Sequence, residues 1–297
     1  QDEIHQKYGG IVPELASRRH IELILPVVDE ALNKAGLTIK DISAIAVCCG
    51  PGLIGSLLVG VCFAKSLAYF NKLSLIAVNH LEGHIFSSFL DMPTLEFPFV
   101  ALLVSGGHTA IYRVDDLGCY KEIGKTRDDA AGEAFDKVAK LLGLGYPGGP
   151  LIDALSQLGS SGTVSFPKPF MKESFDFSFS GLKTSVLNYV KKNPYAKKED
   201  IAASFQESIV DVLVQKTILA TKKEGLDKIV LAGGVSANKA LRGKMEITAQ
   251  QEKIKVYLLS PHLCTDNAAM IASAGFYHFK RGNFADLTLN PRAYLPL

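Results

Sequence analysis

An alternation of apolar runs, glycine-rich turns and helical stretches constrains the fold of this chain most strongly. Residues 43–49 are apolar and typical of a strand, and residues 50–55 carry three glycines. Residues 56–70 suit a helix, and residues 73–79 form a second apolar run. Strand, helix and strand at this spacing predict a parallel pair joined by a right-handed crossover. The chain is therefore expected to be of the α/β class.

A similar alternation continues in the second half of the chain. Residues 99–104 and 109–114 predict two strands joined by a hairpin, and a helix is expected over about 129–142. Two related α/β lobes are the economical architecture for such a pattern. The later elements expected are a helix over 199–223, a buried strand over 228–232, a helix from about Asn238 and a last helix over 267–280.

The lobe bounds follow from a proline-bearing stretch near residue 95. We expect lobe I over residues 1–97 and lobe II over residues 98–266. Residues 267–297 are expected to pack back on lobe I. The segment of about 159–195 is less regular and rich in phenylalanine and lysine, so it is interpreted as an insertion in lobe II.

Composition places the chain among ordinary globular proteins. Its 297 residues are 47% apolar and 21% charged, and the net charge of +2 means that nucleic acid would be bound through a local patch. Five cysteines without a CxxC pair predict reduced thiols and a cytoplasmic location, with the mitochondrial matrix as the alternative. The longest apolar run, residues 53–64, stops at Lys65, so no membrane span or membrane partner is expected.

His80 and His84 form the sharpest chemical motif. They follow the predicted strand 73–79 at the start of a helical run. Positions four apart lie on one face of a helix, so both imidazoles can reach a single cation. Two exposed histidines at a helix start are the alternative interpretation, but the place beyond the carboxyl end of a strand favours a ligand site. The candidates for a third ligand, among which spacing does not choose, are His108, Asp136, His262, Cys264 and Asp266.

Glu82 argues against a metalloprotease. In proteases of the HExxH type the general base directly follows the first histidine. Glu82 is two residues after His80, about 200° around the helix. Its carboxylate is therefore expected to point away from the cation.

Two glycine turns suggest a nucleotide cleft. Residues 105–109 form a hairpin tip, and residues 233–238 open a helix whose N-terminus attracts anions. Each turn alone is typical of structure, but each follows a core strand. Asp136 could accept hydrogen bonds from ribose hydroxyls or belong to a solvated acidic stripe. The loop 147–150 followed by Asp153 is either rigid structure or a backbone surface against a sugar.

Seven lysines accompany the aromatic residues of the predicted insertion. They could contact RNA phosphates, or they could form a solvated surface. These lysines are Lys168, Lys172, Lys183, Lys191, Lys192, Lys197 and Lys198.

Together these motifs resemble one family, the TsaD/Gcp tRNA threonylcarbamoyl transferases, in its bacterial or organellar form. The match follows the family order across nearly the whole chain, which makes it more specific than any single motif. The matching stretches are residues 3–5, 7–18, 50–53, 79–84, 104–109, 132–138, 146–150, 177–183, 202–206, 233–238 and 264–267.

The resemblance implies an actin-like ATPase (ASKHA) fold with two RNase H-like lobes and a central cleft. It also implies that His80, His84 and Asp266 hold one Fe²⁺ or Zn²⁺ ion. Family members begin with a strand and a phosphate-contacting turn that this chain lacks, so lobe I is expected without them. The residues implied to line the site for threonylcarbamoyl-AMP, ATP or AMP are Leu103, Val104, Ser105, Gly106, Gly107, Asp136, Gly149, Asp153 and Asn238.

The implied reaction transfers a threonylcarbamoyl group from threonylcarbamoyl-AMP to the exocyclic amine of the adenosine next to the anticodon in tRNA, releasing AMP. It needs no covalent catalytic residue. The implied partners are tRNA, a paralogous actin-like (TsaB-like) subunit, an ATPase (TsaE-like) subunit and a threonylcarbamoyl-AMP synthase. Two alternatives remain, a small-molecule kinase or ATPase on the same fold and a non-catalytic scaffold paralogue.

Overall fold

The computed structural model describes residue 8 and residues 10–168 and 174–297. The motif at residues 3–5 and Lys172 of the predicted lysine set lie outside the described residues. All five cysteines lie inside them, and none is joined to another by a disulfide bond.

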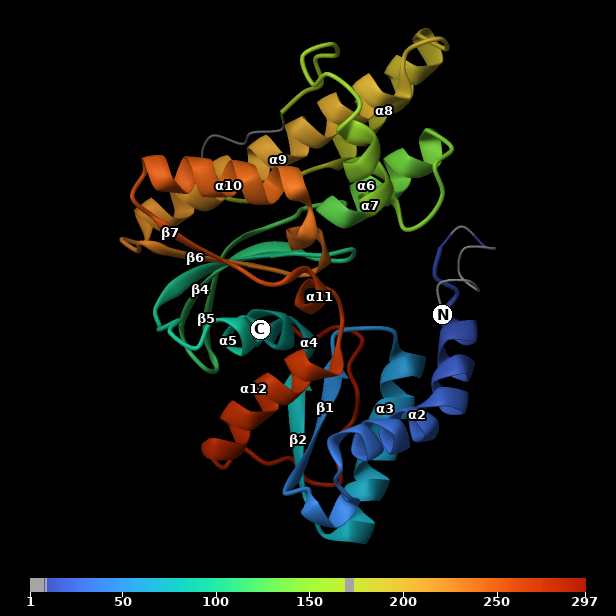
Figure 1. The fold of residues 1–297 in the computed structure, drawn as a ribbon, viewed down its shortest axis with the longest axis vertical. Helices are drawn as coiled ribbons and strands as arrows, with labels where there is room; N and C mark the ends of the chain where they lie inside the picture. Colours follow the sequence, from blue (N-terminus) through green and yellow to red (C-terminus); the bar gives the residue numbers. More distant parts are fainter. Residues whose placement is uncertain (1–7, 9, 169–173) are drawn as a thin grey trace. The chain divides into compact units, whose positions relative to one another are not determined.

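The chain divides into two compact units. Unit 1 comprises Gln1–Leu90 and Asn267–Leu297, and unit 2 comprises Asp91–Asp266. Each unit combines a sheet with helices (Figure 1). The prediction of an α/β protein is therefore confirmed.

Unit 1 is built on a pair of parallel strands. β1 (Ala44–Gly50) pairs with β2 (Ser74–Asn79), and α3 (Ile54–Asn71) connects them, which confirms the predicted strand, helix and strand. Ala64 and Ala68 of α3 are buried against the strand pair. The other helices here are α2 (Pro13–Ala35), the 3₁₀ helix η1 (Ile39–Asp41), α4 (His80–Phe86), α5 (Ser88–Asp91) and α12 (Ala268–Lys280).

α3 matches the helix predicted over residues 56–70 and extends past Lys65, where the apolar run stops. It continues to Asn71, and by length and composition alone it is the one described helix that could cross a membrane. Core helices of folded domains pass the same test, because they are also long and apolar. Lys65 lies within α3, and its Nζ donates to the carbonyl of Leu289, 3.0 Å away.

Unit 2 contains a five-stranded mixed sheet in the order β5-β4-β3-β6-β7. The first three strands along the chain form an antiparallel meander, and β6 and β7 add parallel to β3. β3 is fully buried, which explains its continuous apolar sequence. The strands are β3 (Phe99–Val104), β4 (Thr109–Asp116), β5 (Cys119–Lys125), β6 (Lys228–Ala232) and β7 (Lys255–Leu258).

The longer helices of unit 2 lie on one face of this sheet (Figure 1). Their core contains Phe135 and Phe205, whose rings meet edge to face with centroids 5.4 Å apart. The helices are α6 (Ala131–Leu141), α7 (Gly148–Ser156), α8 (Ser180–Lys192), α9 (Lys198–Lys223), the 3₁₀ helix η2 (Gly234–Ala237), α10 (Lys239–Gln251) and the short α11 (Pro261–Cys264).

The segment predicted to be irregular contains the regular helix α8. Asp128 accepts hydrogen bonds from the backbone N–H groups of Phe179 (2.8 Å) and Ser180 (3.2 Å) at the start of α8. Leu182 on its apolar face is buried in the core. The expected irregularity was wrong over residues 180–192. The carboxylate that caps α8 belongs to Asp128, about fifty positions earlier in the chain, so no local sequence pattern reveals it.

Unit 2 differs from the sequence analysis in two further details. The helix predicted from residue 129 begins at Ala131, so Asp129 lies outside α6. Lys137 of α6 lies 2.7 Å from the Asp129 carboxylate and 2.7 Å from the Glu133 carboxylate, so it pairs with both acids. The edge strands β5 and β7 were not predicted, because their exposed and partly polar residues carry little of the apolar pattern of a core strand.

Candidate metal centre and ligand pocket

The histidine pair lies on the first two turns of a helix that follows a strand directly. The side chain of Asn79, the last residue of β2, accepts a hydrogen bond from the N–H of Leu81 over 2.8 Å and so caps α4. α4 therefore begins at His80. The ring centroids of His80 and His84 lie 4.7 Å apart, and only 1% of His84 is exposed.

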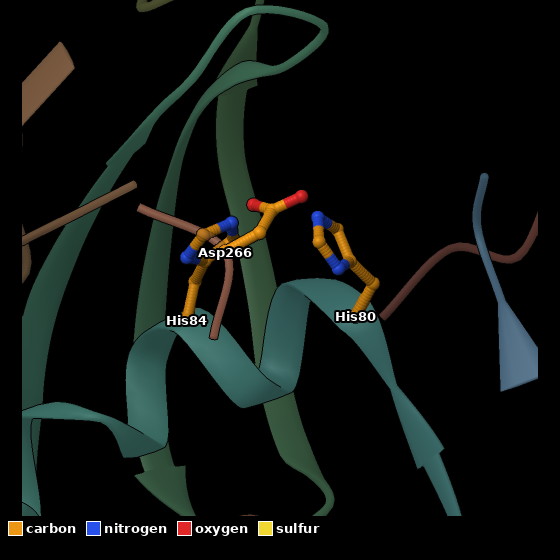
Figure 2. A group of neighbouring side chains, drawn as sticks. All are labelled: His80, His84 and Asp266. Atoms are coloured by element: carbon orange, nitrogen blue, oxygen red, sulfur yellow. The ribbon is translucent and has the colours of Figure 1, made fainter. Parts of the chain in front are cut away.

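Asp266 meets the histidine pair from the far end of the sequence. It directly precedes Asn267, which caps α12 by accepting from the N–H of Met270 over 2.8 Å. One ligand atom from each of His80, His84 and Asp266 lies within 4.8 Å of the other two. Figure 2 shows the carboxylate between the two imidazoles. The other third-ligand candidates, His108, Asp136, His262 and Cys264, are not in this group.

The donor set suits a transition metal. Two imidazole nitrogens and one carboxylate oxygen are typical ligands of Zn²⁺ and of the open Fe²⁺ sites of non-haem iron enzymes. Three protein ligands leave coordination positions for a substrate oxygen or water. Cys264, which could have supplied a soft thiolate, is fully buried with its thiol directed to the backbone carbonyls of Leu259 and Ser260.

Glu82 lies on another side of α4, as its spacing predicted. Its buried carboxylate contacts Nε2 of His278 on α12 over 2.7 Å. A Cβ on the neighbouring Gly83 would come within 2.9 Å of Ile271 Cδ1, so α4 and α12 approach closely here. Glu82 therefore ties the two helices together and is not in the three-residue group.

A separate cavity of about 360 Å³ lies within unit 2. A cavity of this size falls in the range that holds small molecules. Its wall includes five of the nine residues implied by resemblance to bind substrate, namely Gly106, Asp136, Gly149, Asp153 and Asn238. The remaining wall residues are Gly132, Phe135, Tyr146, Pro147, Pro150, Gly234, Val235, Ala237 and Thr265.

The other four implied residues do not line this cavity. Leu103 and Val104 are fully buried in β3, where their side chains belong to the core. Ser105 and Gly107 lie in the hairpin between β3 and β4, whose turn closes with a bond from the N–H of Ser105 to the carbonyl of His108 over 2.8 Å. Of the hairpin, Gly106 reaches the cavity wall.

Tyr146 lines the cavity but was not singled out as a binding residue. Pro147 and Pro150 line it from the stretch 147–150, which was predicted to be either rigid structure or a surface against a sugar. Tyr146 and Pro147 directly precede α7 and Pro150 lies in its first turn, and α7 packs on α6 through Gly148. A Cβ on Gly148 would lie 2.6 Å from Cα of Asp136, so only glycine allows this approach. The cluster of proline and glycine over 146–150 was the signal, since it predicts a rigid loop close to other backbone.

Two carboxylates give the cavity its polar character. Asp136 Oδ1 accepts from the N–H of Gly148 over 2.7 Å. Asp153 Oδ1 is buried and has no hydrogen-bond partner within the described part of the chain. Since buried polar atoms are nearly always paired, Asp153 fits a hydroxyl or amine donated by a ligand.

We expect Asp136→Asn to raise the free energy of unfolding at neutral pH relative to the original protein. Burial raises the pKa of Asp136 above its ordinary 3.8, the Gly148 N–H opposes the rise, and Glu133 adds to it. The ionised carboxyl therefore costs stability, and the cost appears as the pH rises from 3.8 through the raised pKa. Urea unfolding of both proteins from pH 3.5 to 7.5 should show a difference that grows with pH. A difference independent of pH would contradict this assignment.

Known proteins match this chain over most or all of its length. The family model TsaD, described as tRNA N6-adenosine threonylcarbamoyltransferase, matches residues 1–273. A protein of that name from Thermodesulfovibrio yellowstonii is 57% identical over 100% of this chain and 91% of its own length. Proteins of the same name from Clostridium perfringens and Kosmotoga olearia are each 53% identical over 100% of this chain, which covers 89% and 90% of them.

Solved structures support the fold. HypF from T. kodakarensis matches 87% of this chain with a TM-score of 0.66 and 14% identity. A full-length HypF in its phosphate- and nucleotide-bound form matches 86% with a TM-score of 0.64 and 16% identity. The chain spans 43% and 41% of these two proteins. At this identity they show the fold alone, which is the predicted actin-like ATPase fold. The two proteins therefore carry no argument about activity, whereas the matches along the whole sequence show that this chain belongs to the TsaD family of tRNA N6-adenosine threonylcarbamoyltransferases.

Proposed function

We propose that this chain transfers a threonylcarbamoyl group from threonylcarbamoyl-AMP to N6 of an adenosine in tRNA. The observation that carries the proposal is the 57% identity, over the whole chain, with a protein named for this activity. In the reaction the N6 nitrogen bonds to the carbamoyl carbon, the bond from that carbon to the phosphate oxygen breaks, and AMP leaves with the electron pair. One N6 proton is released to solvent or a base.

We propose that His80, His84 and Asp266 hold one Fe²⁺ or Zn²⁺ ion. The distances among their ligand atoms and the borderline character of the donors support this. When bound, such an ion can polarise and orient an acyl oxygen as a Lewis acid. The helix cap at Asn79 and the Asn267 cap of α12 hold the ligands in place before the ion binds.

We propose that the cavity in unit 2 binds the adenosine part of the donor. Asp153 offers an unpartnered acceptor for a ribose hydroxyl or an amine, and Asp136 offers a second carboxylate. Gly106 and Gly149 allow backbone to approach a flat ring or a sugar closely. The N-terminus of α10, capped by Asn238, favours the negative charge of a phosphate.

The direct test is a reconstituted transfer assay. The complete protein and its partners receive labelled threonine, bicarbonate, ATP and tRNA, and the label on tRNA is counted with and without a chelator. We expect labelled tRNA that depends on metal. Phosphorylated product without tRNA would instead indicate a small-molecule kinase, and absence of both would indicate a scaffold paralogue.

The lysines predicted to contact RNA differ in whether an acidic side chain already pairs with them. Lys168 is paired with Asp211, and Lys183 lies 3.5 Å from the Asp129 carboxylate. Four exposed lysines remain around Tyr195, whose side chain is 98% exposed. None of the four forms an ion pair with a described residue, and residues 180–198 hold five lysines and no acidic residue. The four are Lys191, Lys192, Lys197 and Lys198.

We propose that these four lysines and Tyr195 form a tRNA-binding surface at the turn between α8 and α9. Replacing all four lysines by glutamine should weaken tRNA binding about tenfold or more at 0.15 M salt, and the salt dependence should become shallower. Filter binding across a salt series measures both. The matched control removes the same charge from the other end of α9 and its surroundings, with glutamine at Lys222, Lys223, Lys253 and Lys255. Equal weakening by the two sets would count against a specific surface.

The family resemblance supports further proposals about partner proteins and cellular location. We propose that a paralogous actin-like subunit, an ATPase subunit and a threonylcarbamoyl-AMP synthase work with this chain. The relatives reported above are bacterial, which supports the cytoplasm and gives no support to the mitochondrial matrix.

A further inference from the structure

A buried chain of hydrogen bonds runs behind the cavity of unit 2, centred on Gln206. Gln206 lies on α9, is 4% exposed and does not line the cavity. Its Nε2 donates to Ser156 Oγ on α7 over 2.7 Å, and its Oε1 accepts from Asn238 Nδ2 over 2.7 Å. The amide thus joins the helix that carries Asp153 to the residue that caps α10.

Both ends of this chain are backbone groups, so its direction is fixed. At one end the N–H of Leu241 can only donate, and Asn238 Oδ1 accepts it over 2.9 Å. At the other end the carbonyl of Asp153 can only accept, and Ser156 Oγ donates to it over 2.8 Å. Asn238 must therefore donate to Gln206, and Gln206 must donate to Ser156. A side chain that both accepts and donates is required at position 206.

Two of the residues joined by this chain of hydrogen bonds belong to the cavity wall. Asp153 carries the unpartnered Oδ1, and Asn238 opens α10 at the cavity. A buried network in which every member is paired holds its members in one arrangement. The separation of these two wall residues is thereby set by a side chain that does not itself line the cavity.

We infer that Gln206 is a positioning residue for nucleotide binding, acting through Ser156 and Asn238. This inference rests on the proposed function, because it takes the cavity to be the adenosine site. Gln206 holds Asp153 and the N-terminus of α10 at the spacing that the nucleotide needs. Binding of AMP therefore depends on the donor and acceptor polarity of the residue at position 206.

The test compares two substitutions that keep the size of the side chain. Gln206→Met removes both hydrogen bonds, and Gln206→Glu keeps the shape but supplies only acceptors when ionised. Both should raise the dissociation constant of AMP about tenfold or more, because small displacements of positioned groups have effects of this size. Isothermal titration calorimetry with AMP measures this dissociation constant. In the transfer assay the KM for the nucleotide should rise, while tRNA affinity and metal content stay unchanged.

Ser208→Ala is the matched control on the same helix. Ser208 is 3% exposed, and its Oγ donates to the carbonyl of Ser204 within α9, so its loss perturbs a buried hydroxyl without touching the network. We expect AMP affinity to be unchanged in this variant. Equal weakening of AMP binding by Ser208→Ala and Gln206→Met would overturn the inference, since a general loss of rigidity would then explain both.

A second measurement does not depend on the nucleotide. In urea unfolding, Gln206→Met and Ser156→Ala should be strongly non-additive, because each breaks the same bond. Additive losses would overturn the network itself. If the original protein fails to bind AMP while the two substitutions are non-additive, the nucleotide assignment of the proposed function fails and the positioning role toward AMP falls with it. Additive losses with normal AMP binding would overturn only the role of Gln206.

Discussion

The double variant His80→Ala, His84→Ala is expected to lose its transition metal and about a thousandfold in transfer rate. The two rings lie one helical turn apart with centroids separated by 4.7 Å, and they supply two of the three ligand atoms of the group. Asp266 alone is a weak site, because a single carboxylate does not hold a transition metal against water. Elemental analysis of anaerobically purified protein and the tRNA labelling assay are the two measurements.

His262→Ala is a suitable control for this prediction. His262 lies on the short α11, four residues before Asp266, and is exposed and absent from the three-residue group. The control should keep its metal and its transfer rate. A double variant that still binds one equivalent of metal and transfers at the original rate would remove the basis for the metal site.

Gly233→Ala should destabilise the protein by about 3 kcal/mol or more. Gly233 follows β6 and has φ 89°, a conformation that side chains rarely adopt. A Cβ there would also lie 2.5 Å from the carbonyl oxygen of Val104 at the end of the neighbouring β3. Backbone strain and a clash with backbone therefore add, and neither relaxes without separating two core strands. Urea unfolding monitored by circular dichroism gives the free energy of unfolding.

The neighbouring Gly234→Ala is the matched control, since it makes the same change one residue later. Here the nearest atom to an added Cβ is Thr265 Cγ2 at 3.9 Å, an ordinary contact. We expect its free energy of unfolding to change by less than about 0.5 kcal/mol. Similar losses at the two positions would show that the clash with Val104 is relieved by movement elsewhere.

The local sequence pattern predicted much of the buried core but few of the contacts between residues that lie far apart in the sequence. The buried β3 and β6 were predictable, since parallel core strands are continuously apolar. The direction of Glu82 was predictable too, because helical periodicity sets which face a residue occupies. Its partner His278 was not, as the two lie 196 residues apart in the sequence.

The candidate binding residues also divide into those visible in the sequence and those whose role depends on tertiary packing. The PGGP loop and the glycine turn after β6 were visible in the sequence, whereas Gln206 showed nothing beyond its place in a family motif. Its importance appears only when α7, α9 and α10 are packed, because a buried amide acquires a role from the groups that surround it.

The sequence by itself determined the class of fold, the two imidazoles on one face of a helix and the family. These follow from short-range periodicity and from ordered motifs, both of which are written along the chain. Spacing left the third member of the group open among five residues, and the family resemblance implied Asp266. The tertiary structure brings Asp266, and not His108, Asp136, His262 or Cys264, within 4.8 Å of the histidine ligand atoms. A ligand set is a matter of distances between atoms, and residues far apart along a chain come to such distances only through packing, here through α12 held against α4 by Gly83 and Glu82.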